Sequence, residues 1–289
     1  VRTIVFRKIR KVSRAVFGAI LMASSFGGCS GPGPGLEAPG GSVAILSGAD
    51  PSGTSWMLPQ MERLVFRVKW LSIPAGEIIS EIKGVETLRG RPVYRIEVTA
   101  RTTGICSALY RVEDRYVSYL DVERLHTLRH EVRRREGGYE KDAVTDFDQE
   151  GHVAHFVSAT DGSEKTFSVP PDVQDTITAA YVARLREMAP GVSYEIPVCN
   201  SEKNYQVFLV ASRRSSLRVP GVGEREVVLI RPYARLGTEE VKEGRMSGHI
   251  DAGPGHIPYL IVIKAPVFTK VTASLDPERS SFSVPGLSP

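Results

Sequence analysis

The sequence predicts a mainly β protein, built as a single strongly curved antiparallel sheet or an open β-barrel with one substantial α-helix. Three observations lead to this prediction. Apolar and polar residues alternate along most of the segment 62–275, turn signals recur between the alternating stretches, and one stretch has helical spacing instead. Alternation with period two is typical of antiparallel strands that have one face on a core and the other in water.

The strands are predicted from alternation that is clearest in the segments 64–70, 94–101, 205–211 and 267–275. In the first segment Leu64, Phe66, Val68 and Trp70 occupy every second position, which places them on one face of a strand. Glycine and proline favour tight turns, and they predict chain reversals at 74–76, 89–92, 137–138, 161–162, 219–221 and 253–255. Because no linker interrupts 62–275, the sheet is expected to form one domain.

The helix is predicted within the segment 173–185, where apolar residues recur with helical spacing at Val173, Ile177, Ala180, Tyr181 and Leu185. Two prolines precede this segment, Asp172 is the expected N-cap, and the pair at 190–191 is expected to end the helix. Its apolar side is expected to pack against the sheet or to close the open end of the sheet.

The N-terminus resembles a bacterial lipoprotein signal. Residues 1–28 contain six basic residues and no acidic residue, and the apolar run at 15–23 is too short to span a bilayer as a mature helix. Small residues then lead to Cys29, which in such signals is lipidated and becomes the first residue of the mature protein. The alternative is an ordinary cleaved signal that leaves Cys29 as a plain thiol.

The predicted organisation is a signal peptide at 1–28, a flexible tether at 29–60, a β domain at 61–275 and a disordered tail at 276–289. The tether is rich in Gly, Pro, Ser and Ala and offers little apolar surface to bury. Ser30 after the cysteine is similar to the signal that sorts lipoproteins to the outer membrane. We therefore expect a lipid-anchored protein of the cell envelope, on the periplasmic face of the outer membrane in an organism with two membranes.

The charge of the chain argues against nucleic acid as a partner. The full sequence has 37 basic and 33 acidic residues, a net charge of +4. Removing the six basic residues of the leader leaves 31 basic against 33 acidic residues, a net charge of −2. The basic character therefore belongs mostly to the leader, and nucleic-acid binding loses its main support, so we expect no nucleic-acid partner.

A hairpin rich in arginine is predicted around a turn at 137–138. With a two-residue turn, its arginines face carboxylates: Arg135 with Glu140, Arg133 with Asp142 and Arg129 with Asp146. Such cross-strand pairs account for the arginines without a ligand, the alternative being an anion site. Arg134 opposite Lys141 is the remaining like-charge pair, and these two residues are the candidate interaction surface for an acidic partner.

Motifs for catalysis and for metal or cofactor binding are absent from the sequence, including G-x-S-x-G, Walker A, C-x-x-C and H-E-x-x-H. His126 and His130 share a strand face but would lie about 13 Å apart, too far to hold one metal ion. We therefore expect no enzymatic activity, no catalytic residue, no cofactor and no metal site. Cys106 and Cys199 can form a disulfide in an oxidising compartment, although each also lies in an apolar context that suits a buried thiol.

Several strings of the sequence resemble the DUF3108 family of exported bacterial proteins of unknown function. They are ERLVFRVKWLSIPAGE at 62–77, YRIEVTARTTG at 94–104 with the segment 110–119, and the segments 175–181 and 191–205. The resemblance covers about 62–275 and implies an exported, β-rich fold, without catalytic residues to carry over. The sequence departs from the family pattern at 249–259, which puts the register of the last hairpin in doubt.

Three functions are compatible with these observations. The first is a non-enzymatic envelope lipoprotein whose curved sheet binds an amphiphile, a glycan or an envelope component, with the membrane as partner through the lipid anchor. The second is a structural or adaptor protein that acts through the sheet edge and the charged hairpin. An envelope hydrolase ranks last. A sizeable apolar pocket favours the first function over the second, and a Ser, His and carboxylate cluster in a cleft favours the third.

Overall fold

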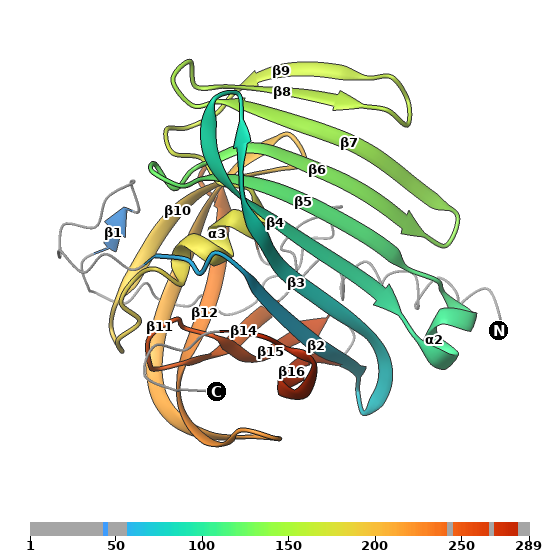
Figure 1. The fold of residues 1–289 in the computed structure, drawn as a ribbon, viewed down its shortest axis with the longest axis vertical. Helices are drawn as coiled ribbons and strands as arrows, with labels where there is room; N and C mark the ends of the chain where they lie inside the picture. Colours follow the sequence, from blue (N-terminus) through green and yellow to red (C-terminus); the bar gives the residue numbers. More distant parts are fainter. Residues whose placement is uncertain (1–42, 46–56, 242–244, 266–268, 283–289) are drawn as a thin grey trace.

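A computed structural model describes residues 43–45, 57–241, 245–265 and 269–282. The predicted leader, Cys29 and most of the predicted tether lie outside these residues. The described chain forms one large curved, unclosed sheet of sixteen strands, drawn in Figure 1. The predicted fold class is confirmed, since the protein is mainly β and one helix of the described chain exceeds seven residues.

The first half of the sheet is an antiparallel meander, in which each strand pairs with the next. Its strands are β2 (Glu62–Trp70), β3 (Ile73–Leu88), β4 (Arg91–Thr102), β5 (Glu113–Asp121), β6 (Thr127–Glu136), β7 (Tyr139–Asp148), β8 (Val153–Ser158) and β9 (Glu164–Ser168). A meander places alternate turns at the same end of the sheet, and the candidate site lies at one of these ends.

The second half of the sheet returns to the first, because its last strand pairs with β2. Its strands are β10 (Ser193–Asn200), β11 (Lys203–Val219), β12 (Gly223–Leu236), β13 (Glu239–Val241), β14 (Arg245–Asp251), β15 (Pro258–Ala265) and β16 (Thr269–Leu275). The short strand β1 (Val43–Ile45) lies within the predicted tether and pairs in parallel with β10. Strands β1 and β9 are therefore the two edges of the sheet.

One predicted turn is wrong. Residues 74–76 lie inside β3, and the chain reverses at Leu71 and Ser72 instead, with Leu71 at φ 59°. Gly76 has a different role from the one inferred, since a Cβ there would lie 2.3 Å from the carbonyl oxygen of Arg101 on the neighbouring strand. The glycine allows β3 and β4 to approach each other closely.

The predicted helix is present as α3 (Thr176–Ala183), but it begins later than expected. Its N-cap is Asp175, whose carboxylate accepts hydrogen bonds from the backbone N–H groups of Ile177 and Thr178. The Thr178 hydroxyl completes a capping box with Asp175. Asp172 cannot take this role because its φ of 52° is left-handed, whereas an N-cap has extended backbone.

Helix α3 lies against β4, β5 and β10 on the concave side of the sheet, where Figure 1 shows it inside the curve. Ile177, Tyr181 and Val182 of this helix are buried in the main hydrophobic cluster. A second helix, α2 (Gly104–Leu109), was not predicted and connects β4 to β5 without burying any residue. Among the described residues, neither helix has the length and apolar character needed to cross a membrane.

The ordered domain extends beyond the predicted boundary at 275. The 3₁₀ helix η1 (Pro277–Arg279) follows β16, and Asp276 donates a backbone hydrogen bond of 2.7 Å to Val65. Arg67 donates to the Asp276 carboxylate at 2.7 Å, and Ser281 exchanges backbone bonds with Arg63. The expectation of a disordered tail is therefore wrong for 276–282, because these residues complete the hydrogen bonding of β2; residues 283–289 lie outside the description.

Candidate functional site

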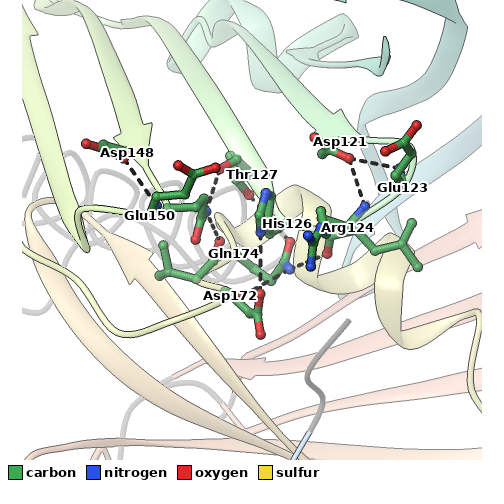
Figure 2. A network of polar contacts seen from close by, with 12 residues as sticks. Asp121, Glu123, Arg124, His126, Thr127, Asp148, Glu150, Asp172 and Gln174 are labelled. Carbon is green, nitrogen blue, oxygen red and sulfur yellow. Dashed lines mark hydrogen bonds and ion pairs between the residues drawn. The ribbon is translucent and has the colours of Figure 1, made fainter. Parts of the chain in front are cut away.

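Three hairpin turns and the segment before α3 meet at one end of the sheet and form a pocket of about 190 Å³. The turns are those between β3 and β4, β5 and β6, and β7 and β8, which the meander places at the same end. The pocket is lined by Arg91, Arg124, His126, Gln149, Glu150, His152, Pro171 and Asp172. Figure 2 shows the polar contacts of this end of the molecule.

The backbone around the pocket is held in an unfavourable conformation. Four residues other than glycine have left-handed φ values here: Arg89 at 52°, Leu125 at 54°, His152 at 52° and Asp172 at 52°. Each such residue costs on the order of 1–3 kcal/mol and persists only where surrounding contacts hold it. Asp121 supplies such contacts, since its carboxylate accepts from the backbone N–H groups of Glu123 and Arg124 at 2.8 Å each (Figure 2).

His126 is the most buried titratable group of the pocket, with 6% of its surface exposed. Its Nδ1 lies 3.4 Å from a carboxylate oxygen of Asp172 (Figure 2). Burial lowers the pKa of His126, against the opposing effect of Asp172, so the ring is neutral at neutral pH. With its proton on Nδ1 toward Asp172, the ring presents Nε2 as an acceptor. This buried Nε2 has no hydrogen-bond partner among the described residues.

Gln149 presents a second acceptor of the same kind. Its side-chain amide nitrogen donates to the carbonyls of Thr127 at 2.6 Å and Val173 at 3.0 Å, and these two bonds fix the orientation of the amide. The amide oxygen is buried and has no partner among the described residues. Buried polar atoms are nearly always hydrogen-bonded, so two buried acceptors in the lining of one pocket call for an explanation.

The two arginines that line the pocket differ in whether a carboxylate balances their charge. Arg91 forms ion pairs with Glu150 at 2.7 Å and Asp121 at 3.6 Å, so its charge is largely balanced. Arg124 is exposed, and its guanidinium makes no ion pair with any described residue. The pocket therefore combines buried neutral acceptors with an available donor, an arrangement that suits a group able both to donate and to accept hydrogen bonds.

The predicted register of the arginine-rich hairpin is confirmed. The structure pairs Arg129 with Asp146, Arg133 with Asp142, Arg135 with Glu140 and Arg134 with Lys141. Arg135 and Arg129 bind carboxylates through two nitrogens each. Gly137 has the left-handed φ of 59° that a two-residue turn requires.

Arg134, however, is not a surface residue, and this prediction is corrected. Its side chain is 6% exposed, it binds the Glu136 carboxylate, and its Nε lies 3.8 Å from Asp114. The cause is the period of the strand, because Arg134 shares its face with Val132, which packs against the main hydrophobic cluster. Burial raises the pKa of Asp114 to about 6, and the nearby Glu136 carboxylate adds to the rise.

Lys141 lies beside Arg134 on the neighbouring strand but is less buried, with its ammonium 5.1 Å from the centre of the Phe156 ring. Burial lowers the pKa of Lys141. The two predicted residues are thus brought together by the register, but the structure assigns them to separate contacts on the concave face. They do not form a joint docking surface for an acidic partner.

Among the described residues, Ser118, His130 and Asp175 form a Ser, His and Asp cluster, but its geometry does not suit a hydrolase. Ser118 Oγ lies 3.0 Å and Asp175 3.7 Å from the same atom, Nδ1 of His130. A catalytic histidine instead uses its two nitrogens for the nucleophile and the carboxylate. Ser118 is also fully buried, with 0% exposure. The cluster therefore belongs to the core rather than to a cleft.

The remaining candidates for chemistry are metal-binding side chains and the two cysteines. Among the described residues, no group of three or more His, Cys, Asp and Glu side chains is placed to hold a metal ion. Cys106 and Cys199 are separate free thiols. Burial raises the pKa of the Cys199 thiol to about 12, which makes it unreactive at neutral pH.

In the part of the chain that the structure describes, α3 and buried side chains of the main hydrophobic cluster lie on the concave side of the sheet. A second pocket, of about 220 Å³, lies on the face of β5–β8 formed by residues such as Val117, Val144 and Val157. Both pockets are below the roughly 300–1,000 Å³ of ordinary small-molecule sites. Neither has the volume to enclose the acyl chain of an amphiphile.

The pocket around His126 was missed by sequence reasoning, which considered this histidine only as a metal ligand. A signal was available in the alternate turns of the predicted meander, which gather the polar residues of 89–91, 121–126 and 148–152 at one end. The contribution of Pro171 and Asp172 had no such signal, because the segment that follows β9 reaches the pocket from elsewhere in the fold.

Comparison with solved structures shows the fold alone. A β-barrel-like protein of the domain of unknown function DUF1849 from Brucella abortus has a TM-score of 0.53 at 8% identity, covering 77% of this chain and 98% of that chain. A lipoprotein candidate from Parabacteroides distasonis gives a TM-score of 0.29 at 11% identity, covering 78% and 99%. A candidate exported protein with a YmcC-like fold from Bacteroides fragilis gives 0.31 at 7% identity, covering 78% and 98%.

The resemblance noted in the sequence is confirmed by comparison with protein families. The search of curated proteins finds no match to the chain. A family model described as "Protein of unknown function (DUF3108)" matches residues 65–276, which is most of the chain and nearly all of the sheet. The chain belongs to the DUF3108 family.

Proposed function

We propose that this protein is a lipid-anchored domain of the bacterial cell envelope that binds a hydroxyl-rich ligand, such as the sugar part of an envelope component, in the pocket around His126. The observation that carries the proposal is the pair of buried acceptors, His126 Nε2 and Gln149 Oε1, in the lining of one pocket. The exported and lipid-anchored state is supported by the leader sequence that ends at Cys29.

A hydroxyl group matches the pocket because it donates one hydrogen bond and accepts others. Its proton would satisfy a buried acceptor, and its oxygen would accept from the Arg124 guanidinium at the mouth. A carboxylate or phosphate offers only acceptors when ionised, and would leave both buried acceptors unsatisfied. The volume of about 190 Å³ equals roughly six water molecules, which favours one small polar ring over a long chain.

The other candidate functions receive less support from the geometry. An amphiphile carrier needs a sizeable apolar pocket, and the two pockets described above, of about 190 and 220 Å³, are too small to enclose an acyl chain. A hydrolase needs an accessible nucleophile next to its base, and the Ser118 hydroxyl beside His130 is fully buried. An adaptor acting through Arg134 and Lys141 loses its main surface, because Arg134 is buried.

The lipid anchor predicts that metabolic labelling with a fatty-acid probe marks the wild-type protein and does not mark Cys29→Ser. Acylation requires the cysteine thiol, which serine cannot replace. The matched control is Cys106→Ser, whose half-buried thiol lies within the folded domain and should leave labelling unchanged. Absence of label on the wild type would refute the anchor while leaving the sugar pocket as a separate question.

The sugar pocket predicts that His126→Phe weakens binding of a sugar by about two- to tenfold without unfolding the domain. Phenylalanine preserves the ring in a buried place but removes Nε2, and one hydrogen bond contributes about 0.5–1.5 kcal/mol. We would titrate ¹⁵N-labelled chain from residue 30 with glucose, N-acetylglucosamine and glycerol, and follow amide shifts at Glu150 and Asp172. This chain retains every contact that the structure describes.

The matched control for this experiment is His155→Phe, since His155 is exposed on β8 and contacts Thr166 away from the pocket. Saturable shifts with a sugar that survive His155→Phe and weaken in His126→Phe would support the proposal. It would be rejected if none of the three probes gives saturable shifts, or if His126→Phe binds as the wild type does. Shifts with inorganic phosphate alone would also reject it and would indicate an anion site.

A further inference from the structure

The end of the sheet opposite the pocket exposes apolar side chains that a soluble surface normally covers. Leu71 and Ile73 of the β2–β3 turn are 54% and 48% exposed, and Ile105 and Leu109 of α2 are 65% and 44% exposed. They are four of the eight large hydrophobic side chains that the described residues expose. Concentration of exposed apolar groups at one place indicates an interaction surface, whereas scattered ones need no explanation.

These four residues belong to one continuous part of the surface. Helix α2 packs against the beginning of β3, where Thr103 N–H donates to the Ala75 carbonyl at 3.0 Å. Ile105 and Leu109 are four positions apart, so they lie on the same face of α2, which leaves them in solvent. We call this surface, formed by Leu71, Ile73, Ile105 and Leu109, the apolar end.

Three lysines border the apolar end. Lys69, Lys264 and Lys270 alternate with inward-facing core residues, so they lie on the convex face of β2, β15 and β16. Lys270 is directly next to the turn, since its carbonyl accepts from the Leu71 N–H at 2.8 Å. All three are exposed, and none forms an ion pair with a described residue.

The pairing of these lysines is itself unfavourable. Lys264 and Lys270 face each other directly across β15 and β16. Like charges in this position destabilise a sheet. Elsewhere on the sheet arginines are paired with carboxylates, as in Arg115 with Glu97 and Arg129 with Asp146. An uncompensated positive pair beside exposed apolar groups fits a negatively charged partner that also receives apolar side chains.

We infer that the apolar end and its three lysines dock onto the surface of an anionic lipid bilayer. The apolar side chains would enter the boundary between headgroups and acyl chains, while the lysines would contact anionic headgroups. This contact is additional to the lipid on Cys29 and independent of the sugar pocket. It also orients the domain, because β4 runs its 12 residues, roughly 40 Å, from Arg91 at the pocket to Thr102 beside α2.

Docking in this orientation would determine which way the pocket faces. With α2 on the bilayer, the turns that form the pocket point away from the membrane; Figure 1 shows α2 and the β3–β4 turn at opposite ends of the meander. The lipid on Cys29 would hold the protein at the membrane without fixing its orientation, because the predicted flexible tether separates it from the sheet. The apolar end would fix the orientation and hold the pocket toward the envelope space.

The test is flotation of the chain from residue 30, which lacks the lipidated cysteine, with vesicles of equal parts phosphatidylglycerol and phosphatidylcholine. We expect binding to these vesicles and weak binding to phosphatidylcholine alone. Each lysine near an anionic surface contributes about fivefold, so Lys69→Gln with Lys264→Gln and Lys270→Gln should weaken binding by about 100-fold. Raising the salt concentration should weaken the wild type in the same direction.

A second variant, Leu71→Ser with Ile105→Ser, tests the apolar contribution and should also reduce binding at constant charge. The matched controls are Lys203→Gln, an exposed lysine on β11, and Val85→Ser, an exposed apolar residue on β3 near the opposite end. Far-ultraviolet circular dichroism confirms that each variant is folded. The inference is overturned if wild type fails to bind anionic vesicles at low salt, or if the control variants lose binding as much as the test variants do.

Discussion

Replacing Arg134 with methionine is expected to lower the free energy of unfolding by about 3–5 kcal/mol at pH 7. The side chain is 6% exposed and is the cation between the carboxylates of Glu136 and Asp114. Removing it leaves two buried acidic groups without their positive partner. The measurement is urea unfolding followed by circular dichroism, with the slope against urea compared to exclude a change in the unfolded state.

Lys141→Met is the matched control, because Lys141 is opposite Arg134 in the sheet and makes no ion pair with a described residue. Its loss should cost less than about 1 kcal/mol. If the two substitutions lower the free energy of unfolding equally, Arg134 does not form the buried cluster with Glu136 and Asp114.

The Arg134→Met variant should also lose less stability at pH 5 than at pH 7. Asp114 already has a pKa near 6 in the folded protein, above its ordinary 3.8, so folding favours its protonated form. A group of this kind stabilises the fold below its ordinary pKa and loses that contribution as pH rises through the folded value. Without Arg134 the pKa of Asp114 in the folded protein rises further. The variant therefore continues to lose stability as the pH increases above the value at which the wild type has stopped losing it.

Replacing Arg184 with methionine is the second substitution expected to cost about 3–5 kcal/mol, because it leaves the Glu62 carboxyl group buried without its cationic partner. Arg184 follows α3 and binds both oxygens of the Glu62 carboxylate, at 2.6 and 2.7 Å. Its Nε donates to the Gly255 carbonyl at 3.0 Å, and its own carbonyl lies 2.8 Å from Nδ1 of His256. One side chain thus joins the helix to the first strand of the meander and to the loop before β15.

A double-mutant cycle separates the ion pair from the remaining contacts of Arg184. Arg184→Met with Glu62→Gln should be more stable than Arg184→Met alone, because the uncompensated charge is gone. Arg214→Met is the matched control, as Arg214 pairs with Glu226 while both side chains are more than half exposed, and it should cost less than about 1 kcal/mol. If the double variant is the less stable one, the charge of Glu62 is not the cause of the loss.

The elements with strong local patterns were predictable. Alternation revealed β2 and β4, and the glycine pair at 137–138 determined the register of β6 and β7 residue by residue. The predictions were weaker at the ends of helices and strands, because a few hydrogen bonds determine where an element begins. Asp172 and Asp175 are both plausible caps by type, and the capping box with Thr178 selects the second. Helix α2 has six residues, too short for a periodic pattern to show.

The candidate site was predictable only in part. The turns of a meander gather at one end for topological reasons, so Arg91, Arg124 and Glu150 follow from the order of strands. Whether His126 is buried, and which of its nitrogens lacks a partner, depends on Asp172, which follows it by 46 residues in the sequence. The same holds for Gln149, whose amide is oriented by the carbonyls of two separate segments.

The sequence by itself determined the fold class, the family resemblance, the hairpin register and the acidic character of the chain without its leader. These properties depend on composition, on short strings of neighbouring residues, and on the spacing of apolar residues along the chain. The tertiary structure alone decided that Arg134 is buried, that α3 packs against β4, β5 and β10, and that the apolar end lies opposite the pocket. The alternation of a strand shows which side chains share a face, but whether that face is covered at a given residue depends on the curvature of the whole sheet and on what packs inside it.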